Sequence, residues 1–98
     1  MPKFVQLYEF TDQGIRAFGQ TVERTRNAEG AIEKMGGKLE TVFWTLGPYD
    51  LVSIAEFPDD ESAPAFSLTL SALGNARVTT LRAFDREEMA KIIATATA

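Results

Sequence analysis

Hydrophobic and polar side chains alternate along four stretches of the chain, and this period of two predicts four β-strands. The stretches span residues 4–10, 39–46, 50–57 and about 77–84. In the first of them, Phe4 and Tyr8 point to one face, and Val5 and Leu7 point to the other. Because both faces carry apolar groups, we expect this strand to lie inside a sheet.

A period of three to four residues replaces the alternation between these strands and predicts helices. The first helical region follows Thr11-Asp12, which can cap it, and its apolar stripe runs from Ile15 to Met35. A break is expected near Gly19. The pair Gly36-Gly37 provides a left-handed stop, so the region is expected to end there.

Two further helices are expected in the second half of the chain. The acidic run Asp59-Asp60-Glu61 lies where a helix N-terminus favours negative charge, and Gly74-Asn75 stops that helix. Asp85 and Glu88 stand in a capping-box relation at the start of a short terminal helix. The apolar faces of these two helices are formed by Ala63, Phe66, Leu70 and Leu73, and by Met89, Ile92 and Ile93.

The block from Thr45 to Asp50 joins the second and third strands as a hairpin turn. Gly47 can adopt a positive φ, Pro48 restricts its own φ, and Asp50 can accept hydrogen bonds from nearby backbone amides. The two strands are therefore expected to pair antiparallel.

The resulting order is β-α-β-β-α-β followed by a helix, which is the ferredoxin-like arrangement of the α+β class. We expect one domain over residues 1–98, with a four-stranded antiparallel sheet and both long helices on one of its faces. The opposite face would then expose apolar side chains of the first and third strands. We expect a second copy of the chain to cover it, sheet against sheet; the alternative is a cover by the terminal helix through Ile92 and Ile93.

The chain has no cysteine and no histidine among its 98 residues. Disulfides, thiolate metal sites and hydrolases of the Ser-His-Asp and Cys-His types are therefore excluded. The net charge of −4 and the scattered basic residues predict no nucleic-acid binding. No apolar stretch approaches the ~20 residues that span a bilayer, and the chain enters a strand pattern at once, so we expect a cytoplasmic protein without membrane contact.

The block Gly47-Pro48-Tyr49-Asp50, with Thr45 before it and Pro58-Asp59-Asp60 after it, resembles the motif of the GYD family of small bacterial and archaeal proteins. The similarity extends over almost the whole chain, through residues 11–15, 36–39 and 73–80. Pro48 is a departure, at a position where families of this group vary. The resemblance implies a ferredoxin-like domain that pairs with a second copy as a dimeric α/β barrel, and it implies no particular reaction.

The middle of the chain also resembles the effector-binding domain of leucine-responsive-type regulators, without their DNA-binding helix-turn-helix. Such a domain standing alone would sense a small molecule or mediate assembly. Our leading hypothesis is accordingly an oligomeric small-molecule-binding or assembly module that uses no cofactor. The alternatives are a cofactor-independent enzyme, monooxygenase- or isomerase-like, acting on a small compound such as an aromatic one, and a structural oligomer with a filled core. A cavity of roughly 300 Å³ or more would argue against the filled core.

Five residues are candidates for a ligand site, namely Tyr8, Trp44, Tyr49, Asp50 and Arg82. Tyr8 and Trp44 have large rings with polar tips, which suit either a pocket or a packed core or interface. Asp50 could accept a hydrogen bond from a ligand or act as a base, but its commoner role, together with Tyr49, is to build a turn. Arg82 could pair with a carboxylate or lie on a solvent-facing edge strand.

Carboxylates occur in two further arrangements. Glu9 and Glu56 each lie near the C-terminal end of a predicted strand and could do acid-base chemistry if they converge. In the enzyme alternative, the acid-base candidates are Asp50, Glu9 and Tyr49. The run Asp59-Asp60-Glu61 could bind a divalent cation, but the helix dipole already explains it, so no metal site is expected.

Overall fold

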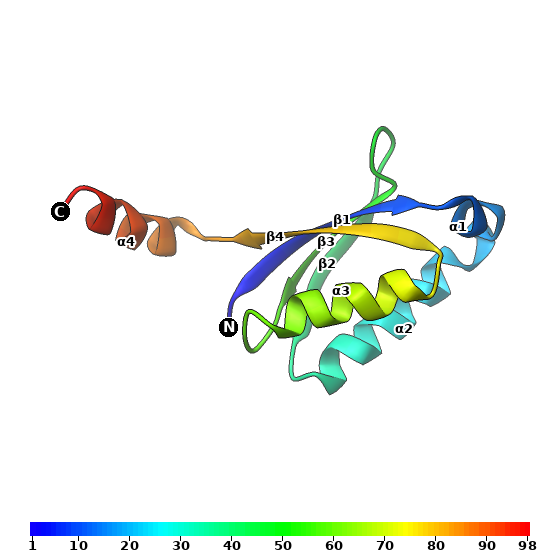
Figure 1. The fold of residues 1–98 in the computed structure, drawn as a ribbon, viewed down its shortest axis with the longest axis horizontal. Coiled ribbons are helices and arrows are strands. Elements are labelled where there is room, and N and C mark those ends of the chain that lie inside the picture. The colour runs from blue at the N-terminus through cyan, green and yellow to red at the C-terminus, as the bar shows by residue number, and fades with distance from the viewer.

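The computed structural model describes residues 1–98. Its elements are β1 (Lys3–Phe10), α1 (Asp12–Arg16), a 3-10 turn η1 (Phe18–Gln20), α2 (Thr21–Lys34), β2 (Lys38–Trp44), β3 (Leu51–Glu56), α3 (Ser62–Ala72), β4 (Ala76–Ala83) and α4 (Arg86–Ala96). The strand order is β2-β3-β1-β4, all neighbours are antiparallel, and α2 and α3 cover one face (Figure 1). The expected ferredoxin-like α+β fold is confirmed. None of the helices combines the length and the hydropathy needed to cross a membrane.

The ends of the helices follow their capping signals. Thr11 Oγ1 accepts a hydrogen bond from the Gly14 amide at 3.1 Å, and Asp85 and Glu88 form a capping box at the start of α4. The break expected in the first helical region is the turn η1. Gly36 ends α2 in the left-handed region, with a φ of +86°. Local side-chain chemistry therefore determines where these helices begin and end.

The acidic run Asp59-Asp60-Glu61 precedes α3, whose N-cap residue Glu61 makes no side-chain capping bond. Asp59 Oδ1 accepts hydrogen bonds from the Ser62 hydroxyl at 2.7 Å and from the Ser62 amide at 2.8 Å. These bonds, the hydroxyl contact foremost, hold the pKa of the Asp59 carboxyl below its ordinary value. Asp60 Oδ1 lies 3.7 Å from the Arg82 side chain. The run thus stabilises the start of α3 through hydrogen bonds and charge.

The core lies between the sheet and the two long helices. The ring of Phe57 is fully buried and lies 5.7 Å from that of Phe4, edge to face, and 5.8 Å from that of Phe66. The other core residues are Ile32, Ala55 and Ala63. Leu73, which the helical spacing places on the core face, is instead 63% exposed. As the C-cap residue of α3 it keeps a helical backbone conformation and lines the pocket described below, so the spacing predicts its side of the helix but not its burial.

The other face of the sheet is apolar and uncovered. Its apolar side chains are those of Val5, Leu7, Phe43, Val52, Ile54 and Leu81. Phe43 is 62% exposed. Helix α4 extends beyond the end of the sheet, and none of its residues is buried (Figure 1). The alternative in which the terminal helix covers this face through Ile92 and Ile93 is therefore wrong for a single copy of the chain.

Candidate ligand-binding pocket

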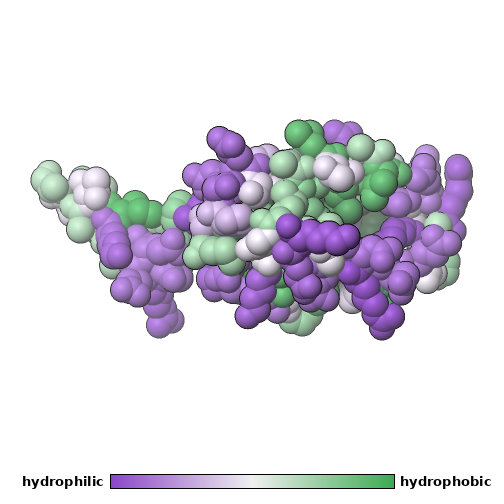
Figure 2. All heavy atoms as spheres, turned by 90° about the horizontal axis from the view of Figure 1, so that it is seen from below, coloured by the Kyte–Doolittle hydropathy of each residue, from purple (hydrophilic) through white to green (hydrophobic).

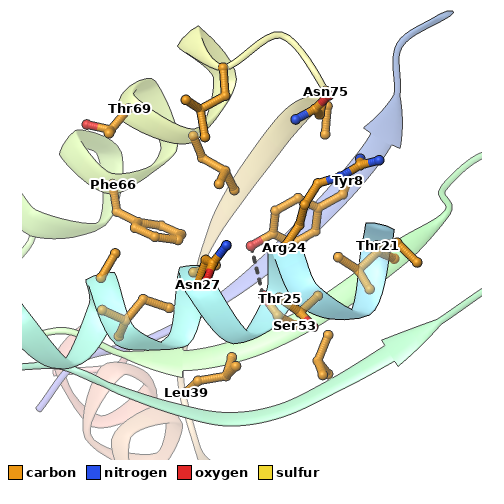
Figure 3. Close-up of a pocket in the computed structure, with 18 of the residues that line it drawn as sticks. Tyr8, Thr21, Arg24, Thr25, Asn27, Leu39, Ser53, Phe66, Thr69 and Asn75 are labelled. Atoms are coloured by element: carbon orange, nitrogen blue, oxygen red, sulfur yellow. Dashed lines mark hydrogen bonds between the residues drawn. The ribbon is translucent and has the colours of Figure 1, made fainter. Parts of the chain in front are cut away.

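A pocket of about 360 Å³ lies between α2, α3 and the helix-covered face of the sheet (Figure 3). Small side chains help to make the space, because α2 presents Ala28 and Ala31 to it. Seen from the helix side, the molecule is hollowed next to a group of hydrophobic atoms, while most of the surrounding surface is hydrophilic (Figure 2). The volume lies in the range of small-molecule sites, about 300–1,000 Å³.

The wall of the pocket is mostly apolar. Its larger side chains include Ile32, Met35, Leu39, Val42, Phe66 and Leu70. No carboxylate lines the pocket, and its cationic residues are Arg24 and Lys34. One nitrogen of the Arg24 guanidinium, Nη2, donates to the carbonyl oxygens of Gly14 and Ala17 beside α1. The pocket therefore suits a molecule with an apolar body.

A chain of hydrogen bonds runs across the floor of the pocket. The Tyr8 hydroxyl lies 3.2 Å from Gln6 Oε1. It also lies 3.2 Å from Ser53 Oγ (Figure 3). Gln6 is fully buried, its Nε2 donates to Ser67 Oγ at 3.0 Å, and Ser67 Oγ lies 2.6 Å from Thr80 Oγ1. Tyr8 and Ser53 line the pocket, whereas the other three residues do not. The floor thus presents two hydroxyl groups to a space whose lining is mostly apolar.

The Tyr8 phenol is neutral at physiological pH, as an unperturbed tyrosine already is. Burial raises its pKa above the ordinary value of 10.0, and the hydrogen bond with Ser53 opposes this rise only in part. The pKa of Tyr8 is higher in the folded protein than in the unfolded one. The contribution of the neutral phenol to the free energy of unfolding is therefore fully present below about pH 10. It is lost as the pH rises through the folded-state pKa.

A single-tyrosine variant measures this pKa directly. The chain has two tyrosines, so Tyr49→Phe leaves Tyr8 alone. We expect its tyrosinate absorbance to titrate above about pH 10 in the folded protein and near pH 10 in denaturant. In Tyr8→Phe, the free energy of unfolding should fall less at alkaline pH than it does in the wild type. A folded-state midpoint at or below the denatured one would contradict the effect of burial.

Of the five residues singled out in the sequence, Tyr8 lines the pocket and the other four do not. Trp44 lies beside the pocket, because its indole N–H donates at 3.0 Å to the hydroxyl of Thr21, which does line it. Asp50 lies after the hairpin turn, and its carboxylate accepts a hydrogen bond from the Phe10 amide at 2.8 Å. That bond ties the hairpin to β1, which is a structural role.

Tyr49 and Arg82 are also engaged by the protein itself. The backbone carbonyl of Tyr49 accepts a hydrogen bond from the Thr45 hydroxyl at 2.6 Å. Arg82 lies opposite Phe4, at the other end of β1 from the pocket, and its guanidinium is 3.5 Å from the Glu88 carboxylate. Arg82 therefore links the end of β4 to the start of α4 through this ion pair. Ligand binding by these residues stays a prediction.

The carboxylates of Glu9 and Glu56 do not converge. Glu56 pairs with Lys3 between β3 and β1, and Lys3 is six residues away from Glu9 in the sequence. At about 3.3 Å per residue, this places the two carboxylates roughly 20 Å apart. Both lie on the uncovered face of the sheet, away from the pocket. The reason is that β1 and β3 run antiparallel, so the C-terminal end of each strand lies beside the N-terminal end of the other.

Sequence reasoning missed Gln6 and Ser53 as parts of the floor. Both carry a signal, because each is a polar residue on the face of a central strand that is otherwise buried: Gln6 lies between Phe4 and Tyr8 on that face. Burying such groups is costly unless they are hydrogen-bonded, so their presence points to a network. The sequence contains no comparable indication that Ala28 helps to open the pocket, because small residues are common on helices.

A solved structure shows the same fold. It is described as the crystal structure of TTHA0845 from Thermus thermophilus, and it matches with a TM-score of 0.55 at 23% sequence identity. The match covers 87% of this chain and 95% of that one. At this level of identity the likeness concerns the fold alone.

Sequence comparison identifies a relative and a family. The relative is the "Glutamine synthetase and cystathionine beta-lyase binding protein" of Thermus thermophilus, 30% identical over 84 residues, which are 85% of this chain and 88% of the relative. The family model described as the GYD domain matches residues 4–93. The family expected from the turn motif is thereby confirmed, and the chain belongs to the GYD family.

Proposed function

We propose that this protein is a homodimeric module that binds a small, mostly apolar molecule in the pocket between α2, α3 and the sheet. The observation that carries the proposal is the pocket itself, about 360 Å³ with an apolar wall and two hydroxyl groups on its floor. A structural oligomer with a filled core would have no use for this space. An apolar wall with a few polar groups is the usual composition of a small-molecule site.

The lining supports binding better than catalysis. General acid-base chemistry needs a titratable group near the reacting atoms. No carboxylate lines the pocket, and the Tyr8 phenol is neutral at physiological pH, with a pKa that burial raises further. The carboxylate of Asp50 is occupied by the Phe10 amide, and Glu9 lies on the uncovered face of the sheet. We therefore place the enzyme alternative second.

Filling the pocket tests the binding function. Ala28→Phe would place a ring in the space that Ala28 leaves open on α2. We expect this variant to bind naphthalene at least about tenfold more weakly than the wild type, because the ring occupies the volume that the ligand needs. The measurement is a fluorescence titration of naphthalene with purified protein. Native mass spectrometry of gently purified protein, followed by denaturing release, would identify any natural ligand.

Ala65→Phe is the matched control. It makes the same change on α3, at an exposed position that does not line the pocket. Its naphthalene affinity should equal that of the wild type. If Ala28→Phe bound naphthalene as well as Ala65→Phe does, the pocket would not be the binding site. If the wild-type protein bound no naphthalene, the proposed function itself would fail.

The uncovered face of the sheet supports the dimer. Its apolar centre is flanked by charges of both signs, with Lys3 and Glu56 3.9 Å apart near one end and Glu9 opposite Arg77 in the strand register at the other. A surface with both signs at both ends can match a second copy of itself by two-fold symmetry. Such a copy would remove the apolar centre from water, which is the favourable term in most protein association.

Helix α4 supports the same arrangement. It has 11 residues, and isolated helices of that length are marginal in water, so it needs a surface to pack against. Its apolar side chains Met89, Ile92 and Ile93 are all exposed in a single copy of the chain. We propose that they pack on the partner copy.

Protein binding is a second candidate function. It is favoured by the name of the relative from Thermus thermophilus, which describes binding to glutamine synthetase and cystathionine beta-lyase. Co-elution of this chain with the purified enzymes of its own source would support the candidate. Separate elution at micromolar concentration would exclude these two partners at that affinity. Repeating the experiment with Ala28→Phe would show whether the pocket takes part.

A further inference from the structure

The hydrogen bonds on the pocket floor have a defined direction. The Tyr8 hydroxyl has one proton and two neighbouring oxygens, Gln6 Oε1 and Ser53 Oγ, each at 3.2 Å. An amide oxygen can only accept, so Tyr8 donates to Gln6. Ser53 must then donate its own proton to the Tyr8 oxygen. The Gln6 amide is held in this orientation because its Nε2 donates to Ser67 Oγ at 3.0 Å.

This direction leaves Ser53 Oγ with unused acceptor capacity. A serine hydroxyl has two lone pairs, and the structure shows no group that donates to this oxygen. Ser53 is only 3% exposed, yet it lines the pocket. Ser53 Oγ already makes one hydrogen bond, to Tyr8, and a ligand that donates a proton to its free lone pair would add a second that a non-donating ligand cannot make.

Charge on the ligand is disfavoured at this point. No carboxylate lines the pocket to balance a cation. Of the two cationic residues that line the pocket, Arg24 donates through Nη2 to the carbonyls of Gly14 and Ala17. Lys34 lines the pocket but is exposed on the last turn of α2. Removing a charge from water without a partner is costly, whereas a neutral group avoids this penalty.

The volume sets the size of the ligand. A dry cavity of about 150 Å³ accommodates benzene, so 360 Å³ has room for a body of about two rings. We propose that the pocket selects a compact apolar ligand of this size that carries one uncharged hydroxyl group, and that Ser53 Oγ accepts the proton of this hydroxyl. This inference rests on the proposed binding function and adds the class of ligand.

Four probes with one ring system test the inference: naphthalene, 2-naphthol, 2-methoxynaphthalene and 2-naphthoate. We expect 2-naphthol to bind the wild-type protein about tenfold more tightly than naphthalene, the size of one net hydrogen bond. The methoxy compound can accept but not donate, so it should bind no better than naphthalene. The carboxylate should bind most weakly. Dissociation constants come from fluorescence titration at a pH where 2-naphthol is neutral.

Two serine variants locate the acceptor. Ser53→Ala removes it and should abolish the preference for 2-naphthol over naphthalene, measured as the ratio of the two dissociation constants. Ser67→Ala changes the same network at a residue that does not line the pocket, and it should keep the preference. A merely structural role for Ser53 would lower the affinity for all the probes together.

The outcomes separate this inference from the proposed function. If naphthalene and 2-naphthol bind equally, or if the methoxy or carboxylate compound binds as well as 2-naphthol, the inference is overturned while the binding function stands. If Ser53→Ala keeps the preference, Ser53 is not the acceptor and the inference is likewise overturned. If none of the probes binds, both the inference and the proposed function fail.

Discussion

Gly14→Ala is expected to lower the free energy of unfolding by about 3 kcal/mol, in the upper range for overpacking a buried site. A Cβ atom on Gly14 would overlap the carbonyl oxygen of Asn75 and lie 2.8 Å from its carbonyl carbon. Asn75 is not free to move aside, because the same oxygen accepts a hydrogen bond from the Thr11 amide at 3.1 Å. Domains have only about 5–15 kcal/mol of stability, so this loss is a large share. Urea denaturation followed by circular dichroism measures it.

Gly30→Ala is the matched control for this change. Gly30 lies in the interior of α2, and no atom outside its own helix lies within 4 Å of a Cβ built there. Alanine is the better helix former, so this variant should be more stable than the wild type by about 0.5–1 kcal/mol. We therefore expect the free energy of unfolding to fall in Gly14→Ala and to rise in Gly30→Ala. A Gly14→Ala protein as stable as the wild type would show that α1 does not approach the turn after α3 this closely.

Leu7→Glu is expected to convert the proposed dimer into a folded monomer. Leu7 lies at the centre of the uncovered face, opposite Val52 of β3 and Thr79 of β4. In a two-fold interface the variant buries two carboxylates without partners. Such burial costs several kcal/mol, so the dissociation constant should rise at least about a thousandfold. Sedimentation velocity over a range of protein concentrations measures this change.

The monomer should stay folded, because Leu7 is already only half-buried in a single copy of the chain. Circular dichroism checks this point. Leu68→Glu is the control, since it makes the same change at an exposed position on α3, and it should leave the dimer intact. A wild-type protein that is monomeric at all concentrations would refute the dimer. An unchanged dimer in Leu7→Glu would show that the sheets do not face each other.

The order of the elements was predictable because their signals are local. Asp85 and Glu88 lie three residues apart and make both hydrogen bonds of the capping box. Gly36 and Gly74 end helices with positive φ, a conformation that favours glycine wherever it occurs. The alternation in β1 and β3 separates a buried face from an uncovered one in the structure as well. Such features depend on neighbours in the sequence, so one sequence is enough to find them.

The candidate site was predictable only in part. Tyr8 was found because a large ring with a polar tip on a central strand is unusual. Asp50 was found as well, but the bond to the Phe10 amide that gives it a structural role joins residues 40 positions apart. The sequence left open whether Glu9 and Glu56 converge, and the antiparallel pairing of β1 with β3 places them far apart. For long-range partners, the residue type shows what a side chain can do but not what it touches.

By itself, the sequence determined the class of fold, the ends of the helices and the family. It also showed that one face of the sheet is apolar, and that the short terminal helix is the one element of the chain that could cover this face. Tertiary structure alone decided that this helix leaves the face uncovered, and that a pocket opens above Tyr8 and Ser53. The physical reason is the same in both cases. Periodicity and capping are properties of adjacent residues, whereas a pocket is the space left between α2, α3 and the sheet, which pack together from distant parts of the chain.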